Sequence, residues 1–230
     1  MLDDDAGIAG WTPTGLETRV RQFRVLWDAE PKPSGLWLDI GCGAGTYTRL
    51  LHEQGHRAIG LDYAVPSLHK ARERTERRGD QLEWVSADIL QLPLRDAVAD
   101  GILCFGVMQA LSEPGPALAE LHRVLRPGGE LWVDALNARC APTRVAEWRR
   151  RRSGHPAHLR YDAPDAFREM VSEAGLRVHS QHWLPILPGR FQRWQWMLET
   201  PGTRGFLQRF QPIGALLSHS LIVRAFRADS

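Results

Sequence analysis

Three glycines at every second position could bring the backbone close to a bound ligand. Gly41, Gly43 and Gly45 follow an apolar run at residues 35–40 and precede an amphipathic segment at residues 46–52. A glycine-rich turn between a buried strand and a helix exposes backbone N–H groups to a ligand. The spacing differs from the nicotinamide dinucleotide fingerprint, whose third glycine lies five positions after the first.

Two carboxylates follow later apolar runs. Asp62 lies 21 residues after Gly41 and ends the run 57–62, while Asp88 follows the run 82–87. A strand-end carboxylate at this distance from a glycine loop can accept hydrogen bonds from both hydroxyls of a ribose. We therefore expect a nucleoside site at one sheet edge. The alternative is that the glycines only form a tight turn and Asp62 caps a helix.

Apolar runs alternate with amphipathic segments, which predicts βαβ units and a largely parallel sheet. The expected helices cover residues 18–27, 46–52, 65–78, 116–125 and 165–174, and the expected strands cover residues 35–40, 57–62, 82–87, 101–105, 130–136, 176–183 and 220–226. This pattern is typical of an α/β doubly wound fold with helices on both faces of the sheet. Because 230 residues leave no room for a second full domain, we expect one domain over residues 1–230.

The composition is that of an ordinary globular chain, with 43% hydrophobic and 24% charged residues. These values exclude a disordered or fibrous chain. The net charge of +2 is too small to attract nucleic acid in general. The sequence contains no run of 18 apolar residues, which is the length that would be needed to span a bilayer. Three cysteines (Cys42, Cys104 and Cys140) and a start without a basic-then-apolar leader predict a cytoplasmic protein without a disulfide framework.

Five short segments occur in an informative order: LDIGCGAG at residues 38–45, GLD at 60–62, AD at 87–88, FGVM at 105–108 and LHRVLRPGG at 121–129. With these segments the sequence resembles the class I S-adenosylmethionine-dependent methyltransferase family. The resemblance implies a seven-stranded Rossmann-like sheet, mostly parallel, whose last strand runs antiparallel. It also implies S-adenosylmethionine as cofactor and S-adenosylhomocysteine as its product.

The resemblance assigns parts of the cofactor to parts of this chain. The glycine loop would hold the methionine part, Asp62 would bind the ribose, and Asp88 with the amide of Ile89 would bind the adenine edge. The backbone of Phe105 and the side chain of Tyr47 would lie near the methionine end. The expected cofactor-binding residues are Asp39, Gly41, Gly43, Gly45, Tyr47, Asp62, Tyr63, Asp88, Ile89 and Phe105.

The sequence departs from the family where the acceptor is expected. Gln109 and Ala110 stand where relatives commonly have Glu-His or Gln-Tyr, which predicts a wider acceptor pocket. No Asp/Asn-Pro-Pro-Tyr/Phe segment follows the fourth strand, and this argues against methylation of a nucleobase amine. No two histidines have metal-ligand spacing on an expected helix, so no metal site is predicted.

Three segments are expected to cover the site, at residues 1–34, 137–164 and 184–219. The last two begin where strands end, at the ligand-binding edge of the sheet. Because residues 184–219 are rich in aromatics, we expect a helical cover whose apolar inner side faces an aromatic or aliphatic acceptor. Core packing of a helical hairpin and contact with a membrane interface are the alternatives. The arginines at 149–152 fit either a solvated helix face or an anion clamp.

A general base, if one is used, must lie within hydrogen-bond reach of the acceptor proton. His182 and His219 are the expected catalytic residues, because both lie next to strand ends at the catalytic edge. Trp183 beside His182 could exclude water and lower the pKa of that histidine. The alternative is that no base exists, since an acidic phenol or an enolate carbon reacts once it is held in line. The expected acceptor-binding residues are Met108, Gln109, His155, Tyr161 and Trp183.

The sequence thus predicts a methyltransferase that acts on a small, apolar or aromatic molecule, with O-methylation favoured. One alternative is an enzyme of the same fold with non-methylating chemistry, and another is a non-catalytic cofactor-binding regulatory module. The expected partner is a small-molecule acceptor, with neither nucleic acid nor stable membrane insertion. The methylated atom and the oligomeric state are open.

Overall fold

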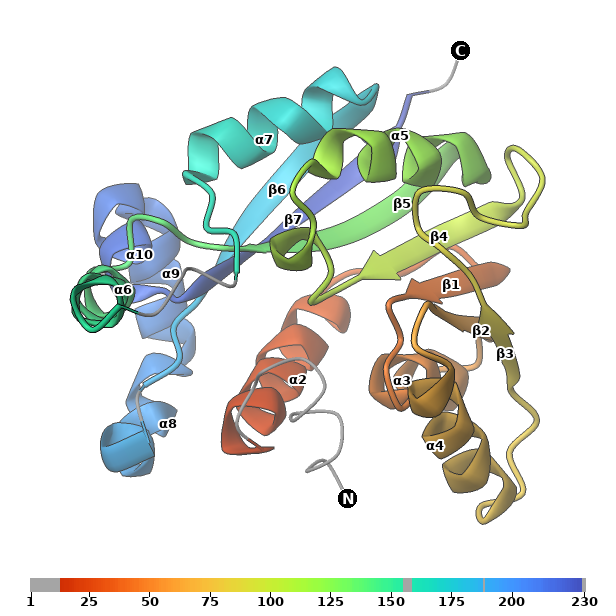
Figure 1. Cartoon of the computed structure of the whole chain (residues 1–230), viewed down its shortest axis with the longest axis horizontal. Helices are drawn as coiled ribbons and strands as arrows, with labels where there is room; N and C mark the ends of the chain where they lie inside the picture. Colours follow the sequence, from red (N-terminus) through yellow and green to blue (C-terminus); the bar gives the residue numbers. More distant parts are fainter. Residues whose placement is uncertain (1–12, 155–158, 188, 229–230) are drawn as a thin grey trace.

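A seven-stranded sheet lies between two layers of helices in the computed structural model, which describes residues 13–154, 159–187 and 189–228 (Figure 1). The strands are β1 (Leu36–Ile40), β2 (Arg57–Asp62), β3 (Glu83–Ser86), β4 (Ala99–Cys104), β5 (Leu125–Leu136), β6 (Leu176–Leu184) and β7 (Ser220–Arg227). Their order is β3-β2-β1-β4-β5-β7-β6, and β7 runs antiparallel to both β5 and β6. The predicted fold class is therefore confirmed.

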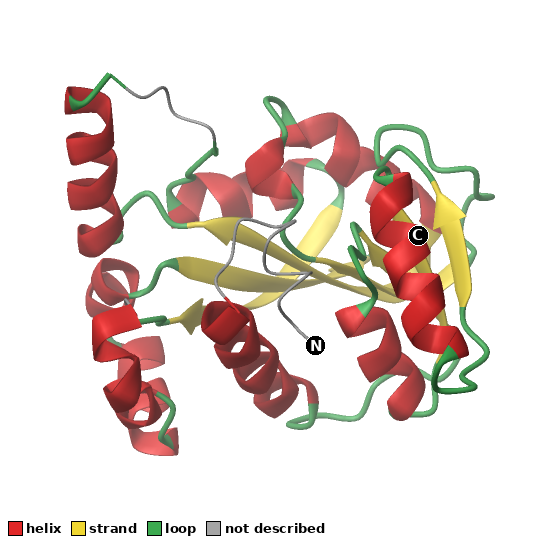
Figure 2. Ribbon diagram, turned by 60° about the horizontal axis from the view of Figure 1, so that its bottom comes forward, coloured by secondary structure: helices red, strands yellow, loops and turns green. Residues whose placement is uncertain are grey.

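The helices are α2 (Pro13–Trp27), α3 (Thr46–Glu53), α4 (Val65–Glu76), α5 (Pro114–Val124), α6 (Ala141–Arg152), α7 (Pro164–Glu173), α8 (Gln195–Leu198), α9 (Pro201–Arg209) and α10 (Gln211–Leu217). Two 3-10 turns complete the list, η1 (Met108–Ala110) and η2 (Gly189–Trp194). Helices α5 and α7 cover one face of the sheet, and α2, α3 and α4 cover the other (Figures 1 and 2). None of the described helices combines the length and the apolar character needed to cross a bilayer.

Most predicted elements match the observed ones closely, but α2 begins at Pro13, five residues before the expected start at 18, and β5 also begins earlier than expected. This strand begins at Leu125, five residues before the expected start at 130. The reason is a register shift, because Ala99 pairs with Leu125 before the regular pairing of β4 with β5 begins at Gly101 and Glu130. The extra strand residues lie at the edge of the sheet that is opposite the expected site.

An aromatic cluster fixes α2 against the sheet. Phe23 is fully buried and lies 5.0 Å from the Phe105 ring and 5.4 Å from the Trp132 ring, measured between ring centroids. Trp27 packs on Trp37 at 4.7 Å. Such edge-on pairs contribute about 1 kcal/mol each beyond the buried area. Phe105 directly follows β4 and Trp132 lies within β5, so the cluster packs the second half of α2 against these two strands.

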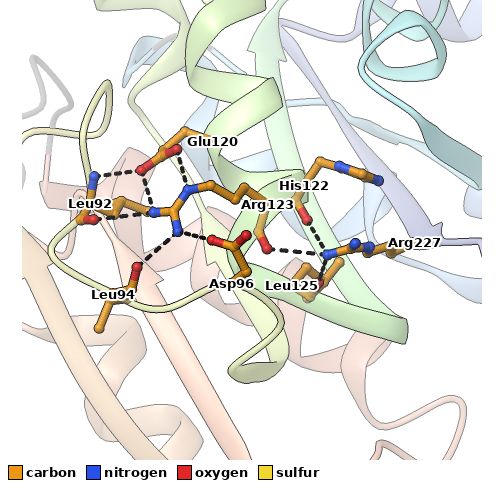
Figure 3. A network of polar contacts seen from close by, with 8 residues as sticks. All are labelled: Leu92, Leu94, Asp96, Glu120, His122, Arg123, Leu125 and Arg227. Carbon is orange, nitrogen blue, oxygen red and sulfur yellow. Dashed lines mark hydrogen bonds and ion pairs between the residues drawn. The ribbon is translucent and has the colours of Figure 1, made fainter.

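A polar network centred on Arg123 anchors the loop between β3 and β4 (Figure 3). Its guanidinium binds the carboxylates of Glu120 and Asp96, each at 2.6 Å, and donates to the carbonyl of Leu94 at 2.9 Å. Glu120 in turn accepts a hydrogen bond from the Leu92 amide at 2.7 Å. The hydrogen bond from Arg123 lowers the pKa of Glu120. The loop that follows Asp88 is thereby tied to α5.

The two long cover segments begin at the same sheet edge, as the strand directions require. Leu136 at the end of β5 and Leu184 at the end of β6 both pair with Ser220, the first residue of β7. Helix α6 lies in the first segment, and η2, α8, α9 and α10 lie in the second. These helices gather at one end of the molecule, beyond the carboxyl ends of β5 and β6 (Figure 1).

Candidate active site

The glycine loop is bound to the end of β2. The amides of Gly41 and Cys42 both donate to the carbonyl of Leu61, at 2.7 and 3.0 Å, and the Gly43 amide donates to Asp62 Oδ2 at 2.8 Å. Gly41 has a φ of +75°, and a Cβ atom there would lie 2.2 Å from Val107 Cγ2. The loop conformation therefore requires glycine at position 41, both for its φ and for its packing against η1.

The Asp62 carboxylate is held in a fixed orientation. Its Oδ1 accepts a hydrogen bond from the Ala64 amide at 2.7 Å, and its Oδ2 accepts the one from Gly43. An ionised carboxylate has about four acceptor positions, so both oxygens can still accept bonds from vicinal hydroxyls. This arrangement supports the predicted role of Asp62 toward a ribose.

A cavity of about 520 Å³ opens above the loop. Eight of the ten expected cofactor-binding residues line it, namely Gly41, Gly43, Tyr47, Asp62, Tyr63, Asp88, Ile89 and Phe105. Asp39 and Gly45 do not belong to this lining. Asp39 is buried and accepts a hydrogen bond from Thr48 Oγ1 at 2.6 Å, and a Cβ atom at Gly45 would lie 2.3 Å from the Trp84 ring. These two residues support the loop from behind.

The lining fits a nucleoside with a charged tail. Asp62 and Asp88 supply acceptors for hydroxyl and amino groups, and Ile89, Leu90 and Leu92 supply apolar surface for a flat base. Asp88 Oδ1 accepts a hydrogen bond from the Leu90 amide at 2.9 Å, which orients its carboxylate. These acceptors and this apolar surface fit the adenosine part of S-adenosylmethionine, which they would hold at this end of the cavity.

The other end of the cavity includes three residues that the sequence analysis did not single out, Leu16, Arg19 and Leu111. Helix α2 contributes Leu16 and Arg19, and η1 with its flanks contributes Val107, Ala110 and Leu111. The sequence did contain a signal for Leu16 and Arg19, because residues 16, 19, 23 and 27 share one helix face at spacings of three and four. Arg19 thus lies on the face that buries Phe23 and Trp27.

Arg19 is a buried cation at this end of the cavity. It is 1% exposed, and its Nη2 donates to Asp134 Oδ2 at 2.5 Å, while Asp134 Oδ1 accepts the Gly106 amide at 2.7 Å. Burial alone would lower the pKa of Arg19, but the Asp134 carboxylate raises it overall. Burial raises the pKa of the neighbouring Tyr47 to about 12, although the nearby Arg19 charge opposes this rise. Arg19 is therefore cationic and Tyr47 neutral near pH 7.

The expected acceptor-binding residues do not meet in this cavity. Met108 is fully buried in the core, and Gln109 is buried with its carbonyl accepting the Arg160 amide at 2.8 Å. Tyr161 packs edge-on against His219, and Trp183 donates to Gln211 Oε1 at 3.1 Å. His155 lies outside the described residues. Met108 lies in the core and not in the cavity because the 3-10 turn and its flanks direct Val107, Ala110 and Leu111 to the cavity instead.

The expected catalytic histidines also lie apart from the described cavity lining. The His182 ring stacks on Trp132 at 6.1 Å between centroids, and its Nε2 lies 2.8 Å from Ser180 Oγ. Burial, with a smaller effect of Arg224, lowers the pKa of His182 to about 4. Trp183 belongs to the core on the opposite face of the sheet, because neighbouring strand residues alternate. It therefore does not shield His182 as expected.

His219 is held between β7 and α6. Its Nδ1 lies 3.0 Å from Thr143 Oγ1, and burial, assisted by Arg19, lowers its pKa to about 4. Neither histidine is part of the described cavity lining. Their assignment as general bases stays a prediction, and their positions argue against it.

The described parts of the two long segments lie apart from this cavity, so their expected role as a cover over the acceptor stays a prediction. No described residue of segments 137–164 and 184–219 lines the cavity. Instead, Trp196 is 65% exposed, and Phe206 and Phe210 are each 46% exposed. The segments leave the correct sheet edge, but they extend sideways beyond β5 and β6, and α2 covers the cavity.

Comparison with known proteins identifies relatives of this chain. Residues 38–133 match the methyltransferase domain family. A malonyl-[acyl-carrier protein] O-methyltransferase from Pseudescherichia vulneris is 31% identical over an alignment of 208 residues that covers 79% of this chain and 75% of that protein. A protein of the same name from Serratia marcescens is 39% identical over 117 residues, and the demethylmenaquinone methyltransferase of Thermus thermophilus is 36% identical over 122 residues. The chain spans about half the length of these last two, 44% and 54%.

Solved structures share the fold at lower identity. A chain of the Haloferax volcanii complex between the Trm112 methyltransferase activator and a methyltransferase aligns with a TM-score of 0.66 at 21% identity, covering 93% of this chain and 92% of that one. The [4+2]-cyclase SpnF aligns equally well, at 0.66 and 21%, over 93% of this chain and 82% of its own. The domain match, the extensively covered relative and the glycine loop bound to Asp62 show that this chain belongs to the class I S-adenosylmethionine-dependent methyltransferases.

Proposed function

We propose that this enzyme methylates an oxygen atom of a small molecule with an apolar or aromatic body. The observation that carries the proposal is the buried Arg19 guanidinium, at the end of the cavity that Leu16, Val107 and Leu111 also line. Leu16, Val107 and Leu111 offer apolar surface to the body of the acceptor, and Arg19 offers a positive charge to an oxygen. Pockets of this kind select ligands by shape and by one or two polar groups.

S-adenosylmethionine, when bound, supplies an activated methyl group on a sulfonium. The residues of this chain bind and orient the two reactants and exclude water. Asp62 and Asp88 would hold the adenosine part, and the loop at Gly41 and Gly43 would hold the methionine part. Helix α2 closes the cavity through Leu16 and Arg19. Such positioning is the main contribution that the protein needs to make when the donor is already activated.

The acid–base groups of the described lining favour an acceptor that reacts as an oxyanion. Tyr47, with a pKa of about 12, cannot take up a proton near pH 7, and no histidine belongs to this lining. A phenol, enol or carboxylic acid that ionises near neutral pH needs no base, and Arg19 would lower its pKa further. An aliphatic amine is protonated at this pH, and Arg19 would repel it. An enolate could also react through carbon, which makes C-methylation the second candidate.

The printed names of relatives cover several acceptor classes. They include a malonyl-[acyl-carrier protein] O-methyltransferase, a demethylmenaquinone methyltransferase and a probable tRNA methyltransferase 9B from Bos taurus, of which the matched region is 23%. The first name describes O-methylation of a malonyl-[acyl-carrier protein], and the second describes methylation of a demethylmenaquinone. Both are compatible with the anionic, apolar acceptor that we propose from Arg19 and its surroundings.

The test is turnover with acceptors of defined chemistry. The purified enzyme is incubated with S-adenosylmethionine and with acidic phenols, carboxylic acids or amines of similar size, and S-adenosylhomocysteine and the product mass are measured. We expect product from phenols or carboxylic acids and none from amines. Product from amines alone would refute the proposal. Cofactor binding without S-adenosylhomocysteine from any acceptor would favour the non-methylating or regulatory alternatives.

Matched variants on α2 test the part assigned to Arg19. Arg19→Met removes the charge, and Arg19→Lys keeps it. Arg21→Met is the control, because Arg21 is half-exposed and pairs with Glu199 on the surface. We expect the KM for the anionic acceptor to rise at least about tenfold in Arg19→Met, since a hydrogen bond to a charged group contributes about 1.5 to 3 kcal/mol. Arg21→Met should keep the wild-type KM.

A further inference from the structure

The cover helices carry an excess of positive charge that the rest of the chain lacks. We define the basic cover as residues 139–152 and 189–217. It contains ten of the 29 basic residues of the chain, all arginines, but only two of the 27 acidic residues, Glu147 and Glu199. Its formal charge is therefore +8, while the remaining residues carry −6 in total. The small net charge of the whole chain conceals this separation.

The basic cover also carries most of the exposed large apolar side chains. Among the described residues, fifteen large apolar side chains are exposed, and ten of them belong to the basic cover. They include every exposed tryptophan and phenylalanine of the described residues, which are Trp148, Trp194, Trp196, Phe206 and Phe210. Single exposed apolar residues are ordinary, but such a concentration marks an interaction surface.

These residues lie on neighbouring elements. Helix α10 contacts both α6 and α9, and α9 contacts α8. All four helices lie at one end of the molecule, and α4 lies at the opposite end (Figure 1). Two arginines lie directly over exposed rings, with Arg193 4.3 Å from the centroid of Trp194 and Arg152 5.3 Å from that of Trp148. Charge and aromatic surface therefore occur together.

We propose that the basic cover docks onto the surface of an anionic lipid membrane. Arginines bind anionic headgroups, tryptophans lie at the interface, and aliphatic side chains reach the acyl boundary. RNA would also attract arginines and stack on aromatic rings. However, it would not require the exposed aliphatic side chains of Met197, Leu216 and Leu217, which are 51%, 48% and 45% exposed. The residues outside the basic cover carry a net negative charge, so the same membrane would repel them. This repulsion would orient the molecule with the basic cover toward the membrane. This inference does not depend on the acceptor.

Vesicle binding tests the inference directly. The protein is sedimented with vesicles of phosphatidylcholine alone and with vesicles that contain 30% phosphatidylglycerol, at about 0.05 and 0.5 M salt. We expect partitioning onto the anionic vesicles to be at least about tenfold stronger at low salt and to fall at high salt, because salt screens the attraction. Trp196→Ser with Phe206→Ser should weaken binding about tenfold at both salt concentrations, because apolar contact is not screened.

Charge variants separate this surface from the general charge of the protein. Arg149→Glu with Arg151→Glu, or the milder pair Arg149→Gln with Arg151→Gln, should reduce binding at least about tenfold. Arg72→Glu with Arg77→Glu, on the exposed side of α4, should bind like the wild type. Circular dichroism and S-adenosylhomocysteine affinity confirm that each variant is folded. Equal binding to both vesicle types, no binding to either, or the same loss in the α4 control would overturn the proposal. A strong affinity for an RNA oligonucleotide without vesicle binding would point to RNA instead.

Discussion

Arg19 of α2 donates a hydrogen bond of 2.5 Å to Asp134 of β5, 115 residues away in the chain, and both side chains are almost fully buried. Asp134 also accepts the Gly106 amide just after β4. The pair therefore joins α2, β5 and the segment between β4 and η1. Because Arg19 lines the cavity, the stability of the fold and the shape of the acceptor end depend on one ion pair.

Breaking this pair should destabilise the protein strongly. Arg19→Met leaves the negative charge of Asp134 uncompensated. Asp134→Asn leaves the positive charge of Arg19 uncompensated, but the new amide oxygen can still accept a hydrogen bond from the Gly106 amide. We expect each single change to lower the free energy of unfolding by about 3 to 5 kcal/mol. The double variant should recover at least about half of the summed loss, and urea unfolding at pH 7 measures all four proteins. Strictly additive losses would show that the two side chains do not interact.

Asp62→Ala should weaken S-adenosylmethionine binding by about 10 to 150-fold, because a hydrogen bond to a charged group contributes about 1.5 to 3 kcal/mol. The change also frees the amides of Gly43 and Ala64, which the carboxylate now orders. Calorimetry with S-adenosylhomocysteine measures the affinity. Asp165→Ala, a change at a mostly exposed carboxylate that does not line the cavity, is the control. An unchanged affinity in folded Asp62→Ala protein would contradict the nucleoside site.

The two buried histidines should make the protein acid-sensitive. The pKa of His182 and that of His219 are each about 4 in the folded state, compared with about 6.5 in an unfolded chain. The unfolded state therefore binds more protons between these values, so stability is complete above about pH 6.5 and is lost as the pH falls toward 4. We expect a loss of about 2 kcal/mol per histidine.

Urea unfolding at pH 7 and pH 4.5 measures this loss. His182→Gln and His219→Gln should each remove part of the pH dependence, with His69→Gln, on the exposed surface of α4, as the control. Because neither histidine belongs to the described cavity lining, both variants should also keep the wild-type dependence of the methylation rate on pH. A shifted rate profile in one of them would restore that histidine as the base.

The sheet and the cofactor half of the site could be predicted because local patterns encode them. Apolar runs mark β1, β2 and β4, and strand direction alone brings Gly41, Asp62 and Asp88 to one edge. The resemblance to the family implied the antiparallel last strand, and β7 begins at this edge, where Ser220 pairs with Leu136. The inferences from strand direction need only the order of elements along the chain.

The acceptor half could not be predicted because it depends on long-range packing. Arg19 reads as an ordinary charged residue until Phe23 packs on Phe105 and turns that helix face inward. Trp183 and His182 are neighbours in sequence, but they belong to opposite faces of the sheet. Aromatic content likewise does not tell an inner lining from an outer surface, and Trp196 proved to be exposed.

Gly41→Ala should damage the cofactor site more than a comparable change elsewhere. Gly41 and Gly55 have φ angles of +75° and +84°, but a Cβ atom at Gly55 would meet nothing within 4 Å, whereas one at Gly41 would lie 2.2 Å from Val107 Cγ2. Gly55→Ala should therefore cost only the left-handed strain of about 1 to 2 kcal/mol. Gly41→Ala should cost more and should also lower S-adenosylhomocysteine affinity at least about tenfold. Adding Val107→Ala should recover the excess cost over Gly55→Ala, as measured by urea unfolding. If Gly41→Ala and Gly55→Ala lose equal stability, the loop is not packed against Val107 as described.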